Sequence, residues 1–163
     1  MKTTLHKTKN DLPEKARGEL VELLNSRLAT AIDLQYQAKQ AHWNVKGPQF
    51  IALHELFDQV SETAESAVDE IAERAVQLGG VARGTVRIAA KESALAEYPL
   101  AATGGTEHVE ALSTALAAFG SQVRAAITLA DELGDAGTAD LFTSLSQAAD
   151  KQLWFVEAHL QAK

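Results

Sequence analysis

One stretch of the sequence, residues 49–78, constrains the fold most strongly, because its apolar residues recur at the spacing of one face of a single long helix. A second stripe of the same helix is polar and spans an arc of about 100° when successive residues are placed about 100° apart. This polar stripe contains His54, Asp58, Asp69 and Glu73. The sequence therefore predicts a helix that buries one face in a core and presents possible metal ligands on another.

These four candidate ligands cannot meet within one chain. Asp58 and Asp69 are eleven residues apart, which is about 16 Å along a helix. Two copies of the helix, packed antiparallel about a two-fold axis level with Thr63 and Ala64, would bring position 58 opposite 69 and position 54 opposite 73. A two-fold interface makes two equivalent sites. We therefore expect a metal centre between subunits, with His54 and Asp58 from one chain and Asp69 and Glu73 from the other.

A solvated acidic face is the alternative explanation of this stripe. Charged residues four positions apart on a helix usually face water, and Glu62 and Glu65 lie on the same side of this helix. The shared pairing axis strengthens the case for a metal centre, but from the residues alone the solvated face stays open as the alternative.

The composition limits both the fold class and the ligand chemistry. The chain has 163 residues, 46% of them hydrophobic, and only three prolines, which favours a single all-α domain. It contains no cysteine, so that nitrogen and oxygen ligands remain, and these suit iron or manganese better than structural zinc. The net charge of −7 opposes nucleic-acid binding outside a local basic segment. No apolar run is long enough for a membrane span, and we expect no secretory signal.

The amino-terminal residues lack helical periodicity and are predicted to form a mobile tail. The tail contains Lys2, Lys7 and Lys9 and no acidic residue. The predicted organisation is a tail over residues 1–10 and one helical domain over residues 11–163. Asp11 is expected to cap the first helix, with Pro13 in its first turn and Glu14 completing the cap.

The rest of the sequence predicts helices that are joined by short breaks and by one long connection. The expected elements are a first helix to about residue 43, a second over 49–78, a crossover over 81–105 with a short helix at about 86–96, a third long helix over 106–133 and a fourth over 138–160. Four long helices with one crossover predict an all-α ferritin-like four-helix bundle. Gly47 and Pro48 break the first two helices apart, and the resulting hairpin brings His42 close to His54.

Several segments resemble the Dps proteins (DNA-binding proteins from starved cells), the miniferritins of the ferritin-like superfamily. They are KQAHWNVKGPQFIALHELFD, AVDEIAERAVQLGGVARGT, YPL, TADL and LWFVEAHL. The spacing of His42, His54, Asp58, Asp69 and Glu73 completes the family's ligand pattern. Other ferritin-like di-iron proteins carry a Glu-x-x-His motif on bundle helices. This motif is absent here, which agrees with a centre placed at a subunit interface.

The resemblance implies a function as well as a fold. His42, His54 and Asp58 would come from one subunit, and Asp69 and Glu73 from its two-fold mate, around two iron ions, with zinc or manganese as possible substitutes. The centre would be a ferroxidase that oxidises Fe(II) to Fe(III), preferentially with hydrogen peroxide. The family assembles as a homo-dodecameric cage that stores ferric oxide and protects DNA from oxidative damage. Trp43 matches a tryptophan beside the centre that could donate an electron, although a packing aromatic at a helix end is the simpler interpretation.

An acidic cluster at the turn between the third and fourth long helices contains Asp131, Glu132, Asp135 and Asp140. Asp140 matches a position that lines an iron-entry pore in the family, and Asp131 and Asp135 are candidates for the same pore. An acidic funnel would concentrate Fe²⁺, but solvated helix ends explain the other cluster members equally well. Two further histidines, His108 and His159, are expected to be surface residues rather than ligands.

Three functions from different classes remain open at this stage. The first is an iron-oxidising storage enzyme, the second is a mainly architectural DNA-compacting protein, and the third is a shell whose centre binds zinc or manganese without turnover. Lys2, Lys7 and Lys9, repeated around a cage, could bind phosphates without sequence preference. The expected location is the cytoplasm, with association to the bacterial nucleoid if DNA is bound.

Overall fold

The structure is a computed structural model that describes residues 4–161, and these residues form five α-helices. The helices are α1 (Glu14–Asn44), α2 (Phe50–Gln77), α3 (Val86–Glu92), α4 (Gly105–Glu132) and α5 (Ala136–Glu157). No strand occurs between residues 4 and 161; a single parallel bridge joins Lys46 and Gly104. Within the same residues, no helix is long and apolar enough to cross a membrane.

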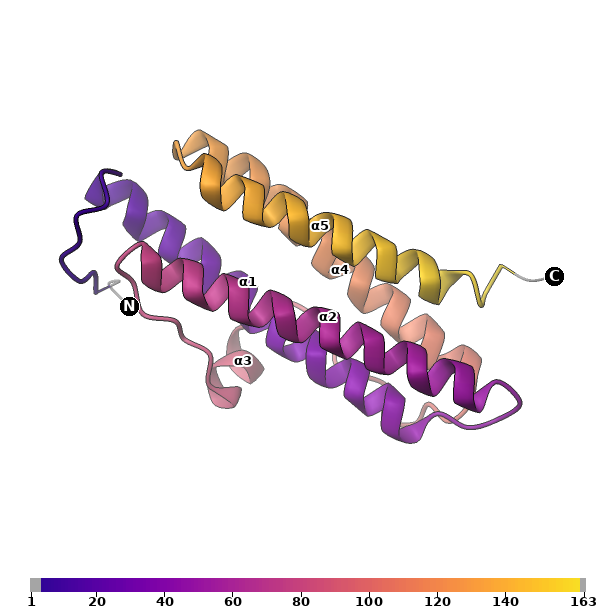
Figure 1. Ribbon diagram of the computed structural model, residues 1–163. Coiled ribbons are helices and arrows are strands. Elements are labelled where there is room, and N and C mark those ends of the chain that lie inside the picture. Colours follow the sequence, from indigo (N-terminus) through magenta and orange to yellow (C-terminus); the bar gives the residue numbers. More distant parts are fainter. Residues whose placement is uncertain (1–3, 162–163) are drawn as a thin grey trace.

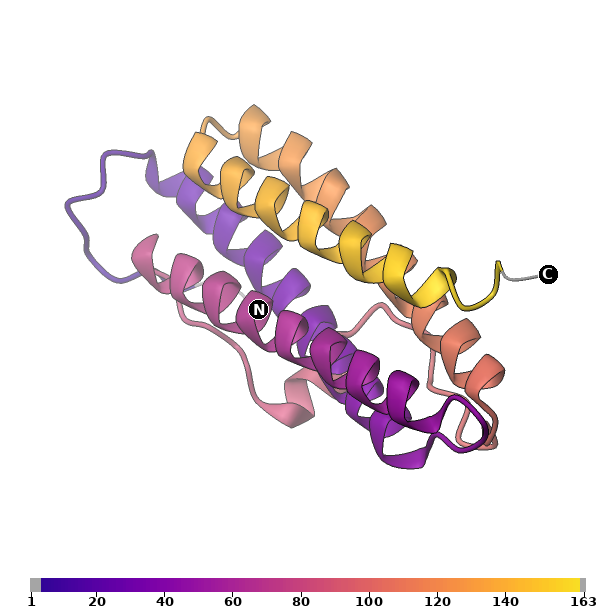
Figure 2. The ribbon, with the colours of Figure 1, turned by 45° about the vertical axis from the view of Figure 1, so that its right-hand side comes forward.

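The four long helices form two antiparallel pairs that stack on each other. The α1–α2 hairpin is one layer and the α4–α5 hairpin is the other, while α3 lies on the outer side of the first layer (Figures 1 and 2). The connection from α2 to α4 runs the length of the bundle and contains α3. This confirms the predicted all-α bundle with one crossover and a short helix inside it.

The core is built from the apolar stripes of the long helices. Leu20, Leu24 and Leu28 follow one face of α1, and Phe57 and Phe142 enter from α2 and α5; all five are completely buried. Each such side chain contributes about 1.5–3 kcal/mol when it is removed from water. This shared core fixes the relative positions of the four long helices and therefore of the side chains at their ends.

Two glycines set the ends of α2. Gly47, in the turn that precedes α2, has φ 111°, and Gly79, just after its end, has φ 87°. Side chains other than glycine rarely adopt such angles, so both turns depend on these residues. The helix itself matches its predicted range to within one residue at each end.

Four other helix ends differ from the predictions. The expected cap at Asp11 is wrong: α1 begins at Glu14, Pro13 occupies the N-cap position, and no side chain caps the helix. The short helix stops at Glu92 rather than about residue 96, because Ser93 leaves the helix and donates its hydroxyl to Asp33 at 2.5 Å. Finally, α5 begins at Ala136, two residues earlier than expected, and ends at Glu157, three residues earlier than expected.

The amino-terminal segment, expected to be a mobile tail, contacts the bundle where the structure describes it. The backbone N–H of His6 donates to the carbonyl of Gly79 at 2.7 Å. Leu5 packs against the core. Residues 5–8 are therefore anchored at the end of α2, which corrects the expectation for this part of the tail. Lys7 and Lys9 are exposed, whereas Lys2 lies outside the described residues.

Candidate metal centre

The end of α1 and the start of α2 bring His42 and His54 into direct contact. The two rings stack with centroids 3.7 Å apart. Nδ1 of His42 lies 2.7 Å from the backbone carbonyl of His54, and Nδ1 of His54 lies 2.8 Å from the carbonyl of His42. The short break between the helices thus has the predicted effect of returning His42 to His54.

This reciprocal pairing determines which ring nitrogens are available to a metal. A backbone carbonyl only accepts hydrogen bonds, so each Nδ1 must carry the proton that it donates. The neutral rings then hold their lone pairs on Nε2. Metal-binding histidines are commonly oriented in this way by a carbonyl on the second nitrogen. The backbone of the hairpin therefore fixes the orientation of both imidazoles and leaves Nε2 of each ring as the atom that could bind a metal.

Asp58 follows His54 by one helical turn and supplies a carboxylate beside the imidazoles. A hydrogen bond from Lys39, together with the positive potential of Lys39, His42 and His54, lowers the pKa of Asp58 despite partial burial. The ammonium of Lys39 is bonded to this carboxylate, and both side chains are about one-third exposed, at 32% and 37%. The lysine thus places a positive charge directly on the carboxylate beside the two imidazoles.

Sequence analysis missed Lys39, although its signal was present. Lys39 precedes His42 by three residues and lies on the same side of α1. A hairpin that pairs position 42 with 54 also places position 39 close to 58. The contact follows from the same hairpin geometry that brings the two histidines together.

The structure does not bring Asp69 and Glu73 to the histidines. Both are exposed on α2, which continues unbroken from Phe50 to Gln77, so that Asp69 stays about 16 Å from Asp58 along the helix axis. Among the described residues of one chain, no group of three or more His, Cys, Asp or Glu side chains could hold a metal ion. One chain therefore carries two separated parts of the predicted ligand set.

The cavity between the two helix pairs is not an alternative centre. The cavity between the helix pairs has a volume of only about 20 Å³, and Thr63 is the one polar residue among those that line it. This is room for about one water molecule. With no carboxylate or imidazole in its wall, the cavity fits neither a pair of metal ions nor their ligands.

Two aromatic residues, Trp43 and Phe50, lie near the histidine pair in the chain, and one of them contacts it. Trp43, next to His42 in the chain, is 63% exposed. The ring of Phe50 lies 5.1 Å from that of His54. The exposure of Trp43 argues against the simple packing role that a helix-end aromatic suggests, since little of the indole contacts its own chain.

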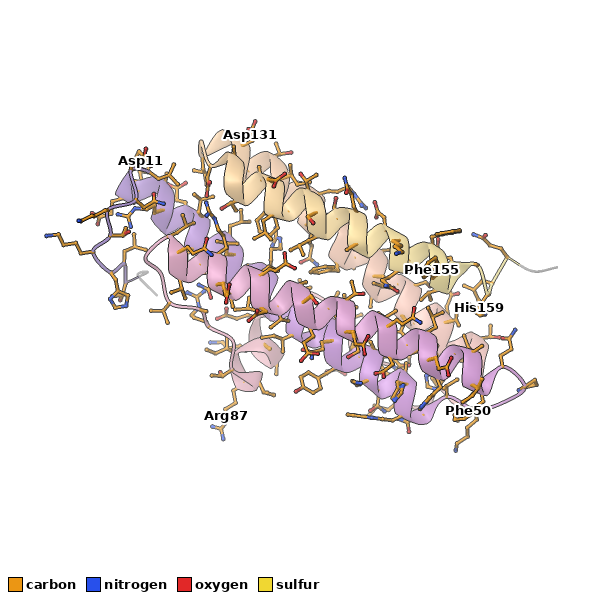
Figure 3. The ribbon with its side chains drawn as sticks, in the orientation of Figure 1. Asp11, Phe50, Arg87, Asp131, Phe155 and His159 are labelled. Atoms are coloured by element: carbon orange, nitrogen blue, oxygen red, sulfur yellow. The ribbon has the colours of Figure 1, made fainter. Side chains whose placement is uncertain are left out.

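The acidic cluster lies at the opposite end of the bundle from the histidines. Figure 3 shows Asp131 at one end, and Phe50 and His159 at the other. Asp131, Glu132 and Asp140 are exposed there. Asp135, the fourth member of the cluster, is buried instead.

Asp135 is a structural residue, which corrects its assignment to an exposed pore. It is 5% exposed, and its carboxylate accepts two bonds of 2.8 Å from Arg74 and caps α5 through the N–H groups of Gly137 and Thr138. Burial alone would raise the pKa of Asp135, but hydrogen bonds from Thr138 and Arg74 lower it overall. Both oxygens are thus used within the chain, and this cap explains the earlier start of α5.

The expectation that His108 is a surface residue is wrong. His108 is 1% exposed, and its Nδ1 lies 2.5 Å from the hydroxyl of Tyr98. His159 is half-buried near the end of the described chain. The burial of His108 depends on the crossover folding back over the start of α4, and nothing in its local sequence indicated this.

Comparisons with known proteins agree with this fold. A family profile described as ferritin-like domain matches residues 21–162. The chain is similar to the DNA protection during starvation protein of Agrobacterium fabrum, with 47% identity over 100% of this chain and 99% of the relative. It is also similar to a protein of that description from Mycolicibacterium smegmatis, with 32% identity over 93% of this chain and 82% of the relative.

Solved structures with a similar fold are Dps proteins as well. DpsA14 from Streptomyces coelicolor superposes with a TM-score of 0.93 and 33% identity, covering 99% of this chain and 96% of the other. A Dps protein from Microbacterium arborescens, solved in a high iron form, has a TM-score of 0.87 and 30% identity, covering 96% of this chain and 100% of the other. The fold and the profile define a ferritin-like protein. Within that class, the chain belongs to the Dps family.

Proposed function

We propose that the protein is a ferroxidase that oxidises Fe(II) to Fe(III), preferentially with hydrogen peroxide, and stores the ferric product in a homo-dodecameric cage. The observation that carries this proposal is the pair of imidazoles, His42 and His54, whose Nε2 atoms are free beside the ionised carboxylate of Asp58. Nitrogen and carboxylate ligands of this kind suit iron. The Dps protein solved in a high iron form supports iron as the substrate.

The centre would be completed by a second copy of the chain. A two-fold axis level with Thr63 and Ala64 would place the partner subunit's Asp69 and the partner subunit's Glu73 opposite Asp58 and His54. Both carboxylates are exposed in the single chain, as a shared site requires. Because one chain holds only part of the ligand set, activity would depend on correct pairing of subunits.

The proposed reaction is balanced with peroxide as the oxidant. Two Fe(II) ions each lose one electron, and one hydrogen peroxide molecule gains these two electrons and two protons to form two water molecules. Binding two iron ions in one centre allows both electrons to be delivered together, so that hydroxyl radical is not released. This would protect DNA, the function named in the relative from Agrobacterium fabrum. Trp43, next to His42 in the chain, would donate an electron if only one iron is oxidised, and its exposure is the support for this role.

Iron would enter the cage through an acidic pore near the α4–α5 turn. Asp140 and Asp131 are exposed there and would attract Fe²⁺ electrostatically. The pore proposal no longer includes Asp135, since its carboxylate is buried and bonded to Arg74.

Non-specific DNA binding by the amino-terminal lysines is a second candidate function. Its support is the exposure of Lys7 and Lys9, although residues 5–8 are anchored against the end of α2. Cages with and without residues 1–10 should be compared by gel shift at several salt concentrations. Binding that falls steeply with salt and disappears on deletion supports the tail, and binding unchanged by deletion excludes it. Cytoplasmic location, with nucleoid association, forms part of this proposal.

The ferroxidase proposal can be tested by mixing Fe(II) with hydrogen peroxide under anaerobic conditions. Wild type should be compared with Asp69→Asn and with the matched control Glu70→Gln, which neutralises a neighbouring exposed carboxylate of α2. We expect rapid oxidation by wild type and the control, and slow oxidation by assembled Asp69→Asn cages. If all three match buffer, the centre is not a ferroxidase, and the zinc or manganese alternative takes its place.

A further inference from the structure

A tyrosine–histidine pair lies between the crossover and the start of α4. Tyr98 belongs to the crossover and His108 to the first turn of α4, and Oη of Tyr98 lies 2.5 Å from Nδ1 of His108. His108 is 1% exposed, and Tyr98 is half-buried. Burial lowers the pKa of His108 and raises the pKa of Tyr98, so both side chains are neutral near pH 7. The iron chemistry proposed above assigns no role to either residue.

The contacts of this pair indicate that Tyr98 donates the hydrogen bond and His108 accepts it. Nε2 of His108 is buried and has no hydrogen-bond partner among the described residues, whichever nitrogen carries the ring proton. If Nδ1 donated to Tyr98, the phenol proton would lack an acceptor as well, because Nδ1 is the one partner of this hydroxyl in the described part of the chain. Each additional unpaired polar group costs free energy. The phenol O–H therefore points at a nitrogen that can act as a base.

The pair lies close to the residues that are proposed to bind iron. The rings of Tyr98 and His108 have centroids 6.0 Å apart. The ring of His108 in turn lies edge-on to that of Phe57, with centroids 6.4 Å apart. Phe57 is completely buried and immediately precedes Asp58 in α2. Two ring contacts thus connect Tyr98 to α2 at the position next to a proposed iron ligand.

Tyr98 differs from the other side chains that could lose an electron. The sequence contains no cysteine, one methionine, two tyrosines and two tryptophans. Trp43 and Trp154 are each 63% exposed, and Tyr36 is 54% exposed. A phenol that loses an electron also loses its proton, because the radical cation is a very strong acid. Among these four aromatic residues, Tyr98 is the one whose proton has a base within hydrogen-bond distance in the described structure.

We propose that Tyr98 is a reserve electron donor for the metal centre, with His108 as the acceptor of its phenolic proton. This inference rests on the proposed function of the centre as a ferroxidase. When a centre holds one Fe(II) ion, hydrogen peroxide needs a second electron to be reduced to two water molecules. Iron supplies one electron and Tyr98 the other, and peroxide takes up two protons from water. The products are Fe(III), a neutral tyrosyl radical and His108 protonated on both nitrogens.

The surroundings of His108 make the proton transfer reversible. A charged imidazole is unfavourable where it is buried, and the positive end of the α4 dipole adds to this cost. His108 therefore returns the proton when the tyrosyl radical is reduced. A second Fe(II) ion supplies that electron and becomes Fe(III), and the phenol O–H forms again. The overall stoichiometry stays at two Fe(II) per hydrogen peroxide, and no hydroxyl radical is released between the two steps.

Freeze-quench electron paramagnetic resonance of cages loaded with one Fe(II) ion per centre tests the proposal. After anaerobic addition of one hydrogen peroxide per centre, wild type should show a tyrosyl radical whose signal narrows when tyrosine is ring-deuterated. Tyr98→Phe should lose this signal. Tyr36→Phe is the matched control, because it removes the hydroxyl of the only other tyrosine in the sequence, and it should keep the signal.

Two variants of His108 distinguish a base from a structural hydrogen bond. His108→Gln offers an amide oxygen that can accept the Tyr98 hydroxyl but cannot take up its proton. His108→Phe keeps an aromatic ring beside Phe57 without an acceptor. Both should lose the tyrosyl signal, and a wild-type signal in His108→Gln would overturn the proposal. If these variants do not assemble, hydroxyl radical captured by a spin trap decides: Tyr98→Phe should release more than Tyr36→Phe, and equal release overturns the proposal.

The failure of this inference can be told apart from the failure of the proposed function. Wild type and Tyr36→Phe loaded with two Fe(II) ions per centre should oxidise both ions, since no reserve electron is needed. If they do so but wild type forms no tyrosyl radical at one Fe(II) per centre, or forms a radical that ring deuteration leaves unchanged, Tyr98 is not the donor. If wild type oxidises Fe(II) no faster than buffer does, the proposed centre itself is wrong.

Discussion

The two ends of the bundle each contain an aspartate paired with a basic side chain, but the pairs differ in how completely their charges are satisfied. At the acidic end, Asp135 is buried and uses both oxygens, bonded to Arg74, Thr138 and the α5 backbone. At the histidine end, Asp58 is 37% exposed, and within residues 4–161 its one ion pair is with Lys39. A carboxylate such as Asp135, whose oxygens are both hydrogen-bonded within the chain, stabilises the fold. A carboxylate such as Asp58, which is paired with one partly exposed lysine, could exchange that lysine for a metal ion.

The largest expected effect comes from breaking the buried pair. Asp135→Ala leaves Arg74 without its partner and removes the α5 cap, which should cost about 3 kcal/mol and lower the melting temperature by about 10 °C. Asp135→Asn keeps a capping oxygen and should cost less. Thermal unfolding measured by circular dichroism checks both. Zn²⁺ affinity of the assembled cages should stay unchanged, and a loss of affinity without a loss of stability would contradict the comparison.

At the histidine end, we expect a large effect on iron oxidation and a small effect on stability. Asp58→Asn removes the charge of a proposed ligand and should slow peroxide-driven Fe(II) oxidation at least about 10-fold. Its partly exposed ion pair is worth about 1 kcal/mol or less, so the melting temperature should change by only about 2–4 °C. Stopped-flow absorbance and thermal unfolding measure the two effects. A strongly destabilised Asp58→Asn would show that its pair with Lys39 is structural as well.

Removal of the competing cation should have a smaller effect, in the favourable direction. Lys39→Met keeps a long side chain but removes the ammonium that pairs with Asp58. Repulsion of a divalent metal decreases, and Zn²⁺ affinity should rise about 5-fold in calorimetry. Lys91→Met, at an exposed position of α3, is the control and should have no effect. Weaker binding by Lys39→Met would mean that the lysine supports the centre.

The smallest expected effect is a pH dependence from His108. Burial lowers its pKa in the folded protein, and Glu107 is the charged group that acts on it in the opposite direction. Below about pH 6.5 the unfolded chain therefore binds a proton that the folded chain does not, and the free energy of unfolding falls as pH decreases. The slope from this one group is at most about 1.4 kcal/mol per pH unit. Denaturant titrations from pH 7 to 5 should show a shallower decline for His108→Gln; parallel declines would contradict the assignment.

The sequence predicted features that depend on local periodicity. The bounds of α2, the hairpin that joins His42 to His54 and the separation of Asp58 from Asp69 all follow from helix geometry and the turn at Gly47. They hold because each depends on one or two adjacent elements. The contact of Lys39 with Asp58 was missed, but it could have been predicted from the same geometry, since the same hairpin places Lys39 beside Asp58.

The features that were missed depend on contacts between distant segments. The role of Asp135 is set by Arg74, which is 61 residues away in sequence. Burial of His108 requires the crossover to return over the start of α4. The cap at Asp11 is an exception with a local cause: the Asn10 side chain accepts the N–H of Leu12 in a turn before α1 begins. Sequence patterns at these positions did not distinguish a surface residue from a buried one.

The measurement that tests the central claim most directly is the activity of mixed cages. Subunits carrying His54→Ala and subunits carrying Asp69→Ala should be inactive as separate cages. If each centre takes His54 from one subunit and Asp69 from its two-fold partner, co-assembly in equal amounts restores one centre in every mixed pair, or about a quarter of the wild-type centres. Co-assembly of His54→Ala with His42→Ala is the control and should restore none. Inactive His54→Ala/Asp69→Ala mixtures, with mixed pairs verified by mass spectrometry, would show that the centre is not shared between subunits.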